Sequence, residues 1–292
     1  MDRQKQIDFH LQKIESLPSL PMVVIDLMRL IENPMTSMSQ IEEVISRDQA
    51  LTLKILRLAN SAYYAIPGGA KTIKRAITFL GLNTLKQVAI SASIVDAFKK
   101  IDSPKFRASE FWRHSFGTAV ASETIANYLK VGSADEAFIC GLIHDMGKLV
   151  LMLIDPEDFL KTCAVASEKG LTFYQAELER ETVTHTMLGS LLAKKWKLPL
   201  LLQSVIMNHH SAYPKLRNIS DPEINQLVDI IFIANQTLHQ LNFGNSGYLI
   251  KPEYNKDVLS RLQLTVQEDE AWLIKTKTAL SKADSMINEL MQ

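Results

Sequence analysis

The stretch Cys140-Gly141-Leu142-Ile143-His144-Asp145-Met146-Gly147-Lys148-Leu149 places a histidine next to an aspartate inside an apolar segment of helical character. Neighbouring side chains on a helix point about 100° apart, so His144 and Asp145 cannot chelate one ion as an i, i+4 pair does. The two can ligate from the end of a helix, or they can serve two ions that the carboxylate bridges. The stretch therefore predicts a helical fold with a metal site at its centre.

Most of the scarce histidines of the chain accompany this motif. Five of the seven fall where a metal-dependent phosphohydrolase needs them, namely His114, His144, His185, His209 and His210. The remaining two, His10 and His239, fit no pattern. Imidazole and carboxylate are the ligand set of Zn, Fe, Mn and Ni sites. A closing carboxylate is expected near the end of a late apolar helix, but the chain reads Ile233-Ala234-Asn235 there.

The hydrophobic pattern of the rest of the chain also predicts helices. Apolar residues recur at three- and four-residue spacing, and strict alternation over the length of a strand is hard to find. Ser39 and Glu42 have capping-box spacing and predict a helix start. Asn60 is expected to end a helix and to pin the following loop through hydrogen bonds to the backbone. Gly81 is expected to stop the helix that begins near Thr72.

Composition limits the class of protein. The chain has 292 residues, of which 47% are hydrophobic, and a formal net charge of zero, which argues against a protein that coats nucleic acid or an anionic membrane. With two cysteines, a disulfide framework is not expected, and a reducing cytoplasm is the natural setting. The charged N-terminus lacks an apolar signal region, and the apolar stretches are too short to span a bilayer. We therefore expect a cytoplasmic protein.

The polar, proline-containing segment 99–105 is the best candidate for a domain boundary. Residues 1–103 are predicted to form an N-terminal helical lobe, and residues 104–292 a second helical lobe with additional C-terminal helices. The second lobe carries the whole His/Asp set.

A two-metal site suits hydrolysis of phosphate esters, because the ions polarise phosphoryl oxygens and lower the pKa of a bound water. Lys148, four residues after His144, can then neutralise a substrate phosphate. Simpler interpretations stay open for both features. The five histidines can form a hydrogen-bonded polar network in the core, and a lysine near a helix end can remain solvated and complement the helix dipole.

Several motifs in the expected order resemble the HDOD domain, a branch of the HD superfamily related to the HD-GYP phosphodiesterases. The resemblance covers about residues 14–215. It rests on the histidines above, on His144-Asp145-Met146-Gly147-Lys148 and Tyr213-Pro214, and on the N-terminal motifs Leu17-Pro18-Ser19-Leu20-Pro21, Asp48-Gln49-Ala50-Leu51-Thr52 and Leu56-Arg57-Leu58-Ala59-Asn60-Ser61. It implies an all-α protein in which an N-terminal helical subdomain packs against an HD-like helical bundle.

The resemblance also implies a ligand set and its departures. The ligands that match the active enzymes are His114, His144, Asp145, His185, His209 and His210. The terminal aspartate position is Asn235, a neutral and weaker ligand, while Ser211 and Ala212 replace a glutamate and a glycine. The weaker ligand at position 235 thus affects the binding of the ion that His114, His144 and Asp145 would hold.

Two hypotheses follow. HDOD proteins resemble the HD-GYP enzymes without their catalysis and act in bacterial signalling, so the first is a regulatory module that retains a metal-binding cluster and binds a signalling protein partner. A bound metal or nucleotide would switch it only by binding two arrangements of the lobes unequally. The second is a metal-dependent phosphohydrolase or phosphodiesterase acting on a nucleotide or cyclic dinucleotide, with Asp145 and Lys148 as its catalytic residues. The ligand set suits one or two divalent ions of Fe, Mn, Ni or Zn.

Overall fold

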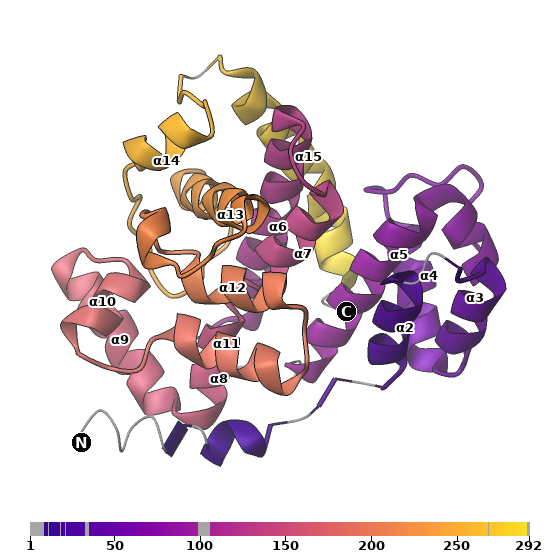
Figure 1. Ribbon diagram of the computed structural model, residues 1–292, viewed down its shortest axis with the longest axis horizontal. Coiled ribbons are helices and arrows are strands. Elements are labelled where there is room, and N and C mark those ends of the chain that lie inside the picture. Colours follow the sequence, from indigo (N-terminus) through magenta and orange to yellow (C-terminus); the bar gives the residue numbers. More distant parts are fainter. Residues whose placement is uncertain are drawn as a thin grey trace. The chain divides into compact units, whose positions relative to one another are not determined.

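The computed structural model of the protein describes residues 9–10, 12–17, 19–20, 22–32, 35–98, 106–267 and 269–290. Within these ranges every regular element is a helix (Figure 1). The predicted all-α fold is confirmed.

The chain folds into two compact units. The larger unit comprises Met1–Leu17 and Ile101–Ala279, and the smaller unit comprises Pro18–Lys100 and Leu280–Gln292. The segment 99–105, which the sequence predicts as a domain boundary, lies outside the described residues.

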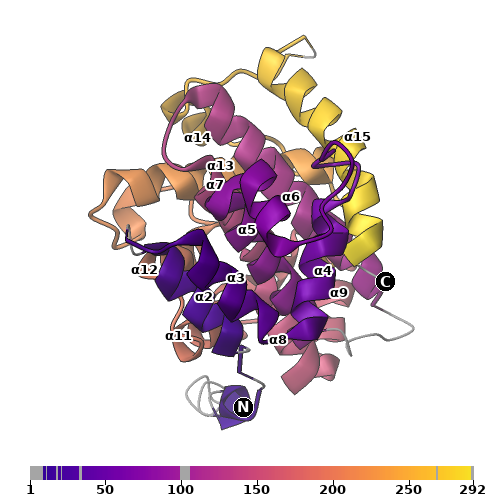
Figure 2. The same ribbon diagram turned by 90° about the vertical axis from the view of Figure 1, so that its right-hand side faces the viewer.

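The smaller unit is built around one long helix, α5, against which α2, α3 and α4 all pack (Figure 2). Its helices are α2 (Met22–Glu32), α3 (Met38–Ser46), α4 (Gln49–Ala59) and α5 (Ile73–Ala97). Helix α5 is interrupted at Gly81, whose φ of 80° and ψ of 169° are not helical. The predicted helix stop at Gly81 is therefore a break, after which a second helical segment follows directly.

Polar side chains set the ends of α3 and α4. The cap of α3 is Ser37, two residues before the predicted Ser39, because Gln40 completes the capping box from this position. Ser37 Oγ accepts from Gln40 N at 3.3 Å, and Ser37 N donates to Gln40 Oε1 at 2.9 Å. At the end of α4 the predicted role of Asn60 is confirmed, since its amide bonds both the N–H and the carbonyl of Ala70.

The larger unit packs its helices around α6, α8 and α13, with α6 against α7 and α13, and α8 against α11. Its helices are α6 (Ala108–Leu129), α7 (Ala134–Ile143), α8 (Met146–Ile154), α9 (Pro156–Lys169), α10 (Phe173–Glu179), α11 (His185–Lys195), α12 (Leu200–Asn208), the 3-10 helix η1 (Pro214–Leu216), α13 (Pro222–Gln240), α14 (Lys256–Arg261) and the first half of α15 (Ala271–Leu290). Lys195 on α11 also holds the N-terminal helical turn, because its Nζ donates to the carbonyls of Ile14, Glu15 and Leu17.

The consecutive helices α7 and α8 form the apolar centre of the larger unit. The expectation that the apolar stretches are too short to span a bilayer is wrong for Ala134–Ile154, which is long and apolar enough by length and composition, but 94% of its apolar 18-residue window is buried inside the protein. Its hydrophobicity is accounted for by its place in the core. The His144-Asp145 motif lies at the junction of these two helices, so the core itself positions the motif.

Candidate metal centre

The HD motif lies where one helix ends and the next begins. His144 is the C-cap of α7, and Asp145 is the N-cap of α8. Both side chains are fully buried. This is the helix-end geometry that the sequence predicts, in which two neighbouring side chains can face the same site.

Two glycines bring Asp145 close to the next ligand. A Cβ on Gly147 would lie 1.7 Å from the carbonyl oxygen of His185, and a Cβ on Gly189 would lie 3.1 Å from the backbone nitrogen of Gly147. Helices α8 and α11 therefore approach through bare backbone, with Asp145 at the start of α8 and His185 at the start of α11. Gly189 on α11 and Gly147 on α8 are the positions at which the two helices make this approach.

The paired histidines stand at the end of α12, and an ion-pair network holds the loop that follows them. Arg217 donates to the carbonyl of Ser211 at 2.7 and 3.0 Å, and Arg261 donates to the carbonyl of Ala212 at 2.7 Å. Both guanidinium groups also pair with Asp229 on α13. Ser211 and Ala212, two of the three positions where the chain departs from the enzyme pattern, thus contribute backbone oxygens to a structural network.

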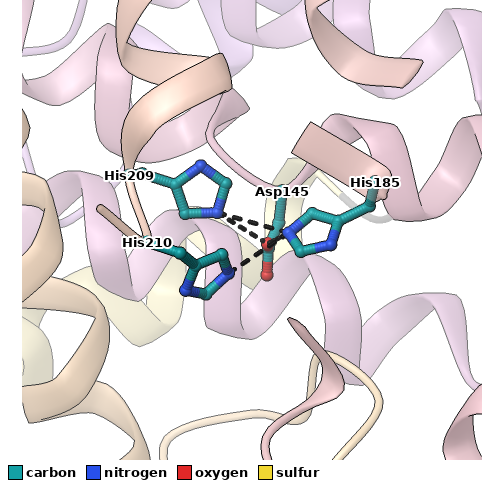
Figure 3. A group of neighbouring side chains, drawn as sticks. All are labelled: Asp145, His185, His209 and His210. Atoms are coloured by element: carbon teal, nitrogen blue, oxygen red, sulfur yellow. Dashed lines mark hydrogen bonds and ion pairs between the residues drawn. The ribbon is translucent and has the colours of Figure 1, made fainter. Parts of the chain in front are cut away.

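Four of the predicted ligands meet at one point. Asp145, His185, His209 and His210 each offer a ligand atom, and these atoms lie within 4.8 Å of one another. Asp145 Oδ1 is 3.3 Å from His185 Nε2 and 3.4 Å from His209 Nε2, and His185 Nε2 is 3.2 Å from His210 Nε2. Figure 3 shows the three imidazoles directed at the carboxylate.

Hydrogen bonds on the far side of the rings orient these histidines. The Nδ1 atoms of His144 and His209 donate to the backbone carbonyls of Gly141 and Ile206, at 2.7 and 2.8 Å. A carbonyl only accepts, so Nδ1 of each ring carries a proton, and Nε2 is the atom that faces the centre and can present a lone pair to a cation. Among the described residues, His144 Nε2 and Asp145 Oδ1 find no hydrogen-bond partner although both atoms are buried. Lone pairs converging on a buried carboxylate fit a divalent cation.

Protonation favours the same interpretation. Burial lowers the pKa of His209 to about 3 and lowers the pKa of His210 well below its usual value. Burial alone would raise the pKa of Asp145, but His144 and Lys148 beside it hold that pKa well below its usual range. Neutral imidazoles at His209 and His210 beside an ionised carboxylate are the forms that bind metal.

A second group consists of His114, His144 and Asp145, whose ligand atoms also lie within 4.8 Å of one another. It shares the carboxylate with the first group. Burial lowers the pKa of His114 to about 3. Asn235 on α13 faces this group, and His114 Nε2 donates to Asn235 Oδ1 at 3.0 Å. All the sequence-predicted ligands are thus brought together around Asp145.

Lys148 is not solvated. Its side chain is fully buried, so the interpretation of Lys148 as an exposed lysine at a helix end is wrong. Its Nζ donates to Asp145 Oδ2 at 2.7 Å and to Ser246 Oγ at 3.1 Å. Because burying a lone ammonium is costly, the carboxylate at i−3 is the reason that Lys148 can point inward.

Two residues beside the predicted ligands lie outside the sequence motifs. Glu177 on α10 is fully buried and accepts from both His185 N, at 2.6 Å, and His185 Nδ1, at 2.7 Å. His239, which fits no pattern in the sequence, also lies beside the site, since its ring centroid is 4.6 Å from that of His114 and 3.9 Å from that of Tyr248. The i, i+4 spacing of Asn235 and His239 on one helix face is the signal that could have found it.

A cavity of about 420 Å³ lies beside the paired histidines. Its lining includes His209, His210, Tyr174, Phe232 and Asn235. The ring of Tyr174 stacks on His210, with centroids 4.7 Å apart and planes 13° from parallel. This volume is in the range of pockets that hold small ligands.

Comparison with known proteins connects this geometry to a family. The model of the HDOD domain family matches residues 17–212. An uncharacterized protein of Treponema pallidum (strain Nichols) is 27% identical over 241 residues, which are 81% of this chain and 44% of that protein. The chain thus spans less than half the length of this relative.

Solved structures share the fold. An HDOD domain protein of unknown function from Geobacter sulfurreducens is 24% identical, with a TM-score of 0.74 over 99% of this chain and 97% of that one. A candidate phosphohydrolase from Shewanella amazonensis SB2B is 25% identical, with a TM-score of 0.70 over 97% of both chains. A candidate signal transduction protein from Marinobacter aquaeolei VT8 is 17% identical, with a TM-score of 0.76 over 100% of this chain and 67% of that one.

Proposed function

The chain belongs to the HDOD domain family, and on that premise we propose that it is a regulatory signalling module whose buried His/Asp centre binds a divalent transition-metal ion. The proposed ligands are Asp145, His185, His209 and His210. Fe, Mn, Ni and Zn all suit a set of imidazoles and one carboxylate.

One observation carries the proposal. His185 and His209 present Nε2 atoms 3.4 Å apart, and both lie within 3.4 Å of Asp145 Oδ1. Once His185 has lost its second proton, both imidazoles carry their one proton on Nδ1, and they cannot hydrogen-bond to each other through Nε2. A cation between them and the carboxylate satisfies all three atoms, and the closed hydrophobic surroundings keep the rings in place.

The regulatory part of the proposal is supported by the departures from the enzyme pattern. Asn235 is neutral where the enzymes have an aspartate, and Ser211 stands where they have a glutamate. The site therefore has fewer negative charges to hold two ions and activate a water. A bound ion, or a ligand in the cavity beside His209 and His210, would then bias one conformation and so the binding of a signalling protein partner.

Elemental analysis tests the metal claim. We expect protein purified without added metal, or reconstituted with Mn²⁺ or Fe²⁺ and freed of excess ion, to retain transition metal. Asp145→Ala should abolish retention, whereas Asp158→Ala, which removes a carboxylate paired with Arg180, should retain it. Wild-type protein that retains no ion after reconstitution would refute the proposal.

Hydrolysis is the second candidate function, and the cavity is the observation that favours it. It places space for a small ligand directly beside two metal-ligand candidates, His209 and His210. The Shewanella protein of similar fold named as a candidate phosphohydrolase supports this hypothesis. Metal-loaded protein incubated with mononucleotides, cyclic dinucleotides and a generic phosphodiester should release product if the hypothesis is right. A rate that Asp145→Ala leaves unchanged would come from a contaminating enzyme.

The partner claim has its own test. Pull-down from the native cell with the full chain should recover a protein whose retention depends on whether the bait is metal-loaded or treated with chelator. Equal recovery of every protein by the two forms of the bait would contradict a metal-dependent switch.

A further inference from the structure

We infer that the centre takes one ion, and that Lys148 and Asn235 close the place of a second. The inference rests on the proposed metal-binding function, and it concerns the two oxygens of Asp145. In a two-ion site this carboxylate would bridge, with one oxygen on each ion. Here the two oxygens have different surroundings.

Oδ1 of Asp145 faces imidazole nitrogens. His185 Nε2 and His209 Nε2 lie 3.3 and 3.4 Å away, and His210 completes the set. No hydrogen bond of the described residues reaches this oxygen. It is the free end of the carboxylate, and the donor set around it suits one cation.

Oδ2 of Asp145 faces a cation that belongs to the protein. Lys148 Nζ donates to it at 2.7 Å, while His144 Nε2 and His114 Nε2 are 3.4 and 3.9 Å from it. The position that a second ion would share with Oδ2 is therefore next to an ammonium group. Like charges at this separation repel strongly where water is excluded.

Several contacts hold Lys148 in this position. The side chain is fully buried, and its Nζ also donates to Ser246 Oγ at 3.1 Å. The Nζ lies 5.2 Å from the ring centroid of Phe173 and 5.5 Å from that of Tyr248, so two aromatic faces stabilise the positive charge. An incoming ion would have to displace an ammonium that is bonded on several sides.

Asn235 occupies a nitrogen that a second ion would need. His114 Nε2 is 3.0 Å from Asn235 Oδ1, and this nitrogen is the one that faces Asp145. Whichever way the amide is turned, its hydrogen bond engages Nε2, as donor or as acceptor. Asn235 also brings no negative charge. The carboxylate that could offset a divalent ion at the second position is therefore that of Asp145, which is shared with the first ion and already paired with Lys148.

The consequence is functional. Hydrolysis by two ions needs one ion at the attacking oxygen and one at the leaving oxygen. A centre with one ion and a fixed ammonium can bind an anionic group of a ligand, but it lacks that symmetric clamp. The inference thus supports binding in preference to hydrolysis.

Ion counting tests the inference on the intact chain. The protein is loaded with Mn²⁺, freed of excess ion, and examined by elemental analysis and by electron paramagnetic resonance. We expect one Mn²⁺ per chain with the hyperfine pattern of an isolated ion. Two ions per chain with a spin-coupled signal would overturn the inference and leave the proposed metal binding intact. Wild-type protein without any ion would overturn both.

Variants test the assignment to these residues. Asn235→Asp combined with Lys148→Met should bind a second Mn²⁺ and show a spin-coupled signal. Asn235→Asp combined with Lys195→Met is the matched control, because Lys195 is a lysine that donates to backbone carbonyls away from the centre. This control variant should keep one ion. A double variant at 148 and 235 that folds by circular dichroism but binds one ion would overturn the roles of Lys148 and Asn235.

Discussion

Glu177 shows how a carboxylate outside every motif controls a ligand. It accepts from the backbone and from Nδ1 of His185, and so fixes the ring and makes its Nε2 more basic. Glu179, two residues later on the same helix, instead forms an exposed ion pair with Lys169. The two glutamates therefore form a natural test pair.

We predict that Glu177→Gln lowers the affinity for Mn²⁺ by about 10- to 100-fold, as for other partners that orient metal ligands. Glu179→Gln should leave the affinity unchanged. Isothermal titration calorimetry of the three proteins measures the difference. If both variants lose the same affinity for Mn²⁺, the affinity depends on the overall charge of α10 and not on the hydrogen bond from His185 to Glu177.

His185 also predicts a pH dependence. Burial lowers its pKa, but the Glu177 and Asp145 carboxylates outweigh burial and raise that pKa above its usual value. In the metal-free protein His185 therefore keeps a proton to higher pH, and an ion must displace it. Metal affinity should weaken as the pH falls through this raised pKa.

Near neutral pH we expect binding of Mn²⁺ to release protons, and to release fewer in Glu177→Gln, because loss of the Glu177 charge lowers the pKa of His185. Calorimetry in buffers with different heats of ionisation counts these protons. A release that is the same in both proteins would contradict the assignment to His185.

The residues of the site divide into those that spacing predicts and those that only the fold reveals. His144, Asp145 and the paired histidines belong to a motif, so sequence alone identifies them. Glu177 lies in the charged run Glu177-Leu178-Glu179-Arg180-Glu181, in which nothing distinguishes the buried carboxylate from the exposed ones. The orientation of Lys148 likewise depends on how α8 packs, which periodicity does not specify.

At the scale of elements, the approach of α8 and α11 sets the geometry of the centre. Local rules predicted most helices, because period and caps act within a few residues. They failed at the start of α3, where Ser37 and Ser39 compete for one cap, and at Gly81, where a break does not end the element. The contact between Gly147 and Gly189 is long-range, so no local rule contains it.

Gly147→Ala is expected to destabilise the protein. Helix propensity alone predicts the opposite, because replacing glycine by alanine inside a helix raises the stability by up to about 1 kcal/mol. The added methyl would overlap the carbonyl of His185, and overpacking of this kind costs about 1–3 kcal/mol or more. Thermal unfolding measures the sign. Gly189→Ala should cost less, because its nearest contact is the Ile206 side chain at 2.8 Å. A Gly147→Ala protein more stable than wild type would refute the contact.

At the scale of the molecule, the three tryptophans give a selective probe. Trp112, Trp196 and Trp272 all belong to the larger unit, which also holds the candidate centre. Tryptophan fluorescence therefore follows unfolding of the unit that would bind the ion.

We predict that free Mn²⁺ at about 100 times its dissociation constant stabilises this unit by about 2.7 kcal/mol. The midpoint of the fluorescence-detected transition should rise by roughly 5–10 °C. Chelator should reverse the rise, and Asp145→Ala should not show it. If the wild-type protein retains the ion but its midpoint does not change with Mn²⁺, the ion must bind the unfolded chain equally well.

The order in which the two units follow each other along the chain determines which fragments of the protein can be expressed as complete units. One unit is made of residues 1–17 and 101–279, so residues 18–100 are an insertion within its sequence. Residues 280–292 belong to the same unit as this insertion. A fragment beginning at residue 104 would strip Lys195 of its bonds to Ile14, Glu15 and Leu17. The unit that holds the candidate centre would have to be excised by splicing residue 17 to residue 101 through a linker, since a single cut would leave both products incomplete.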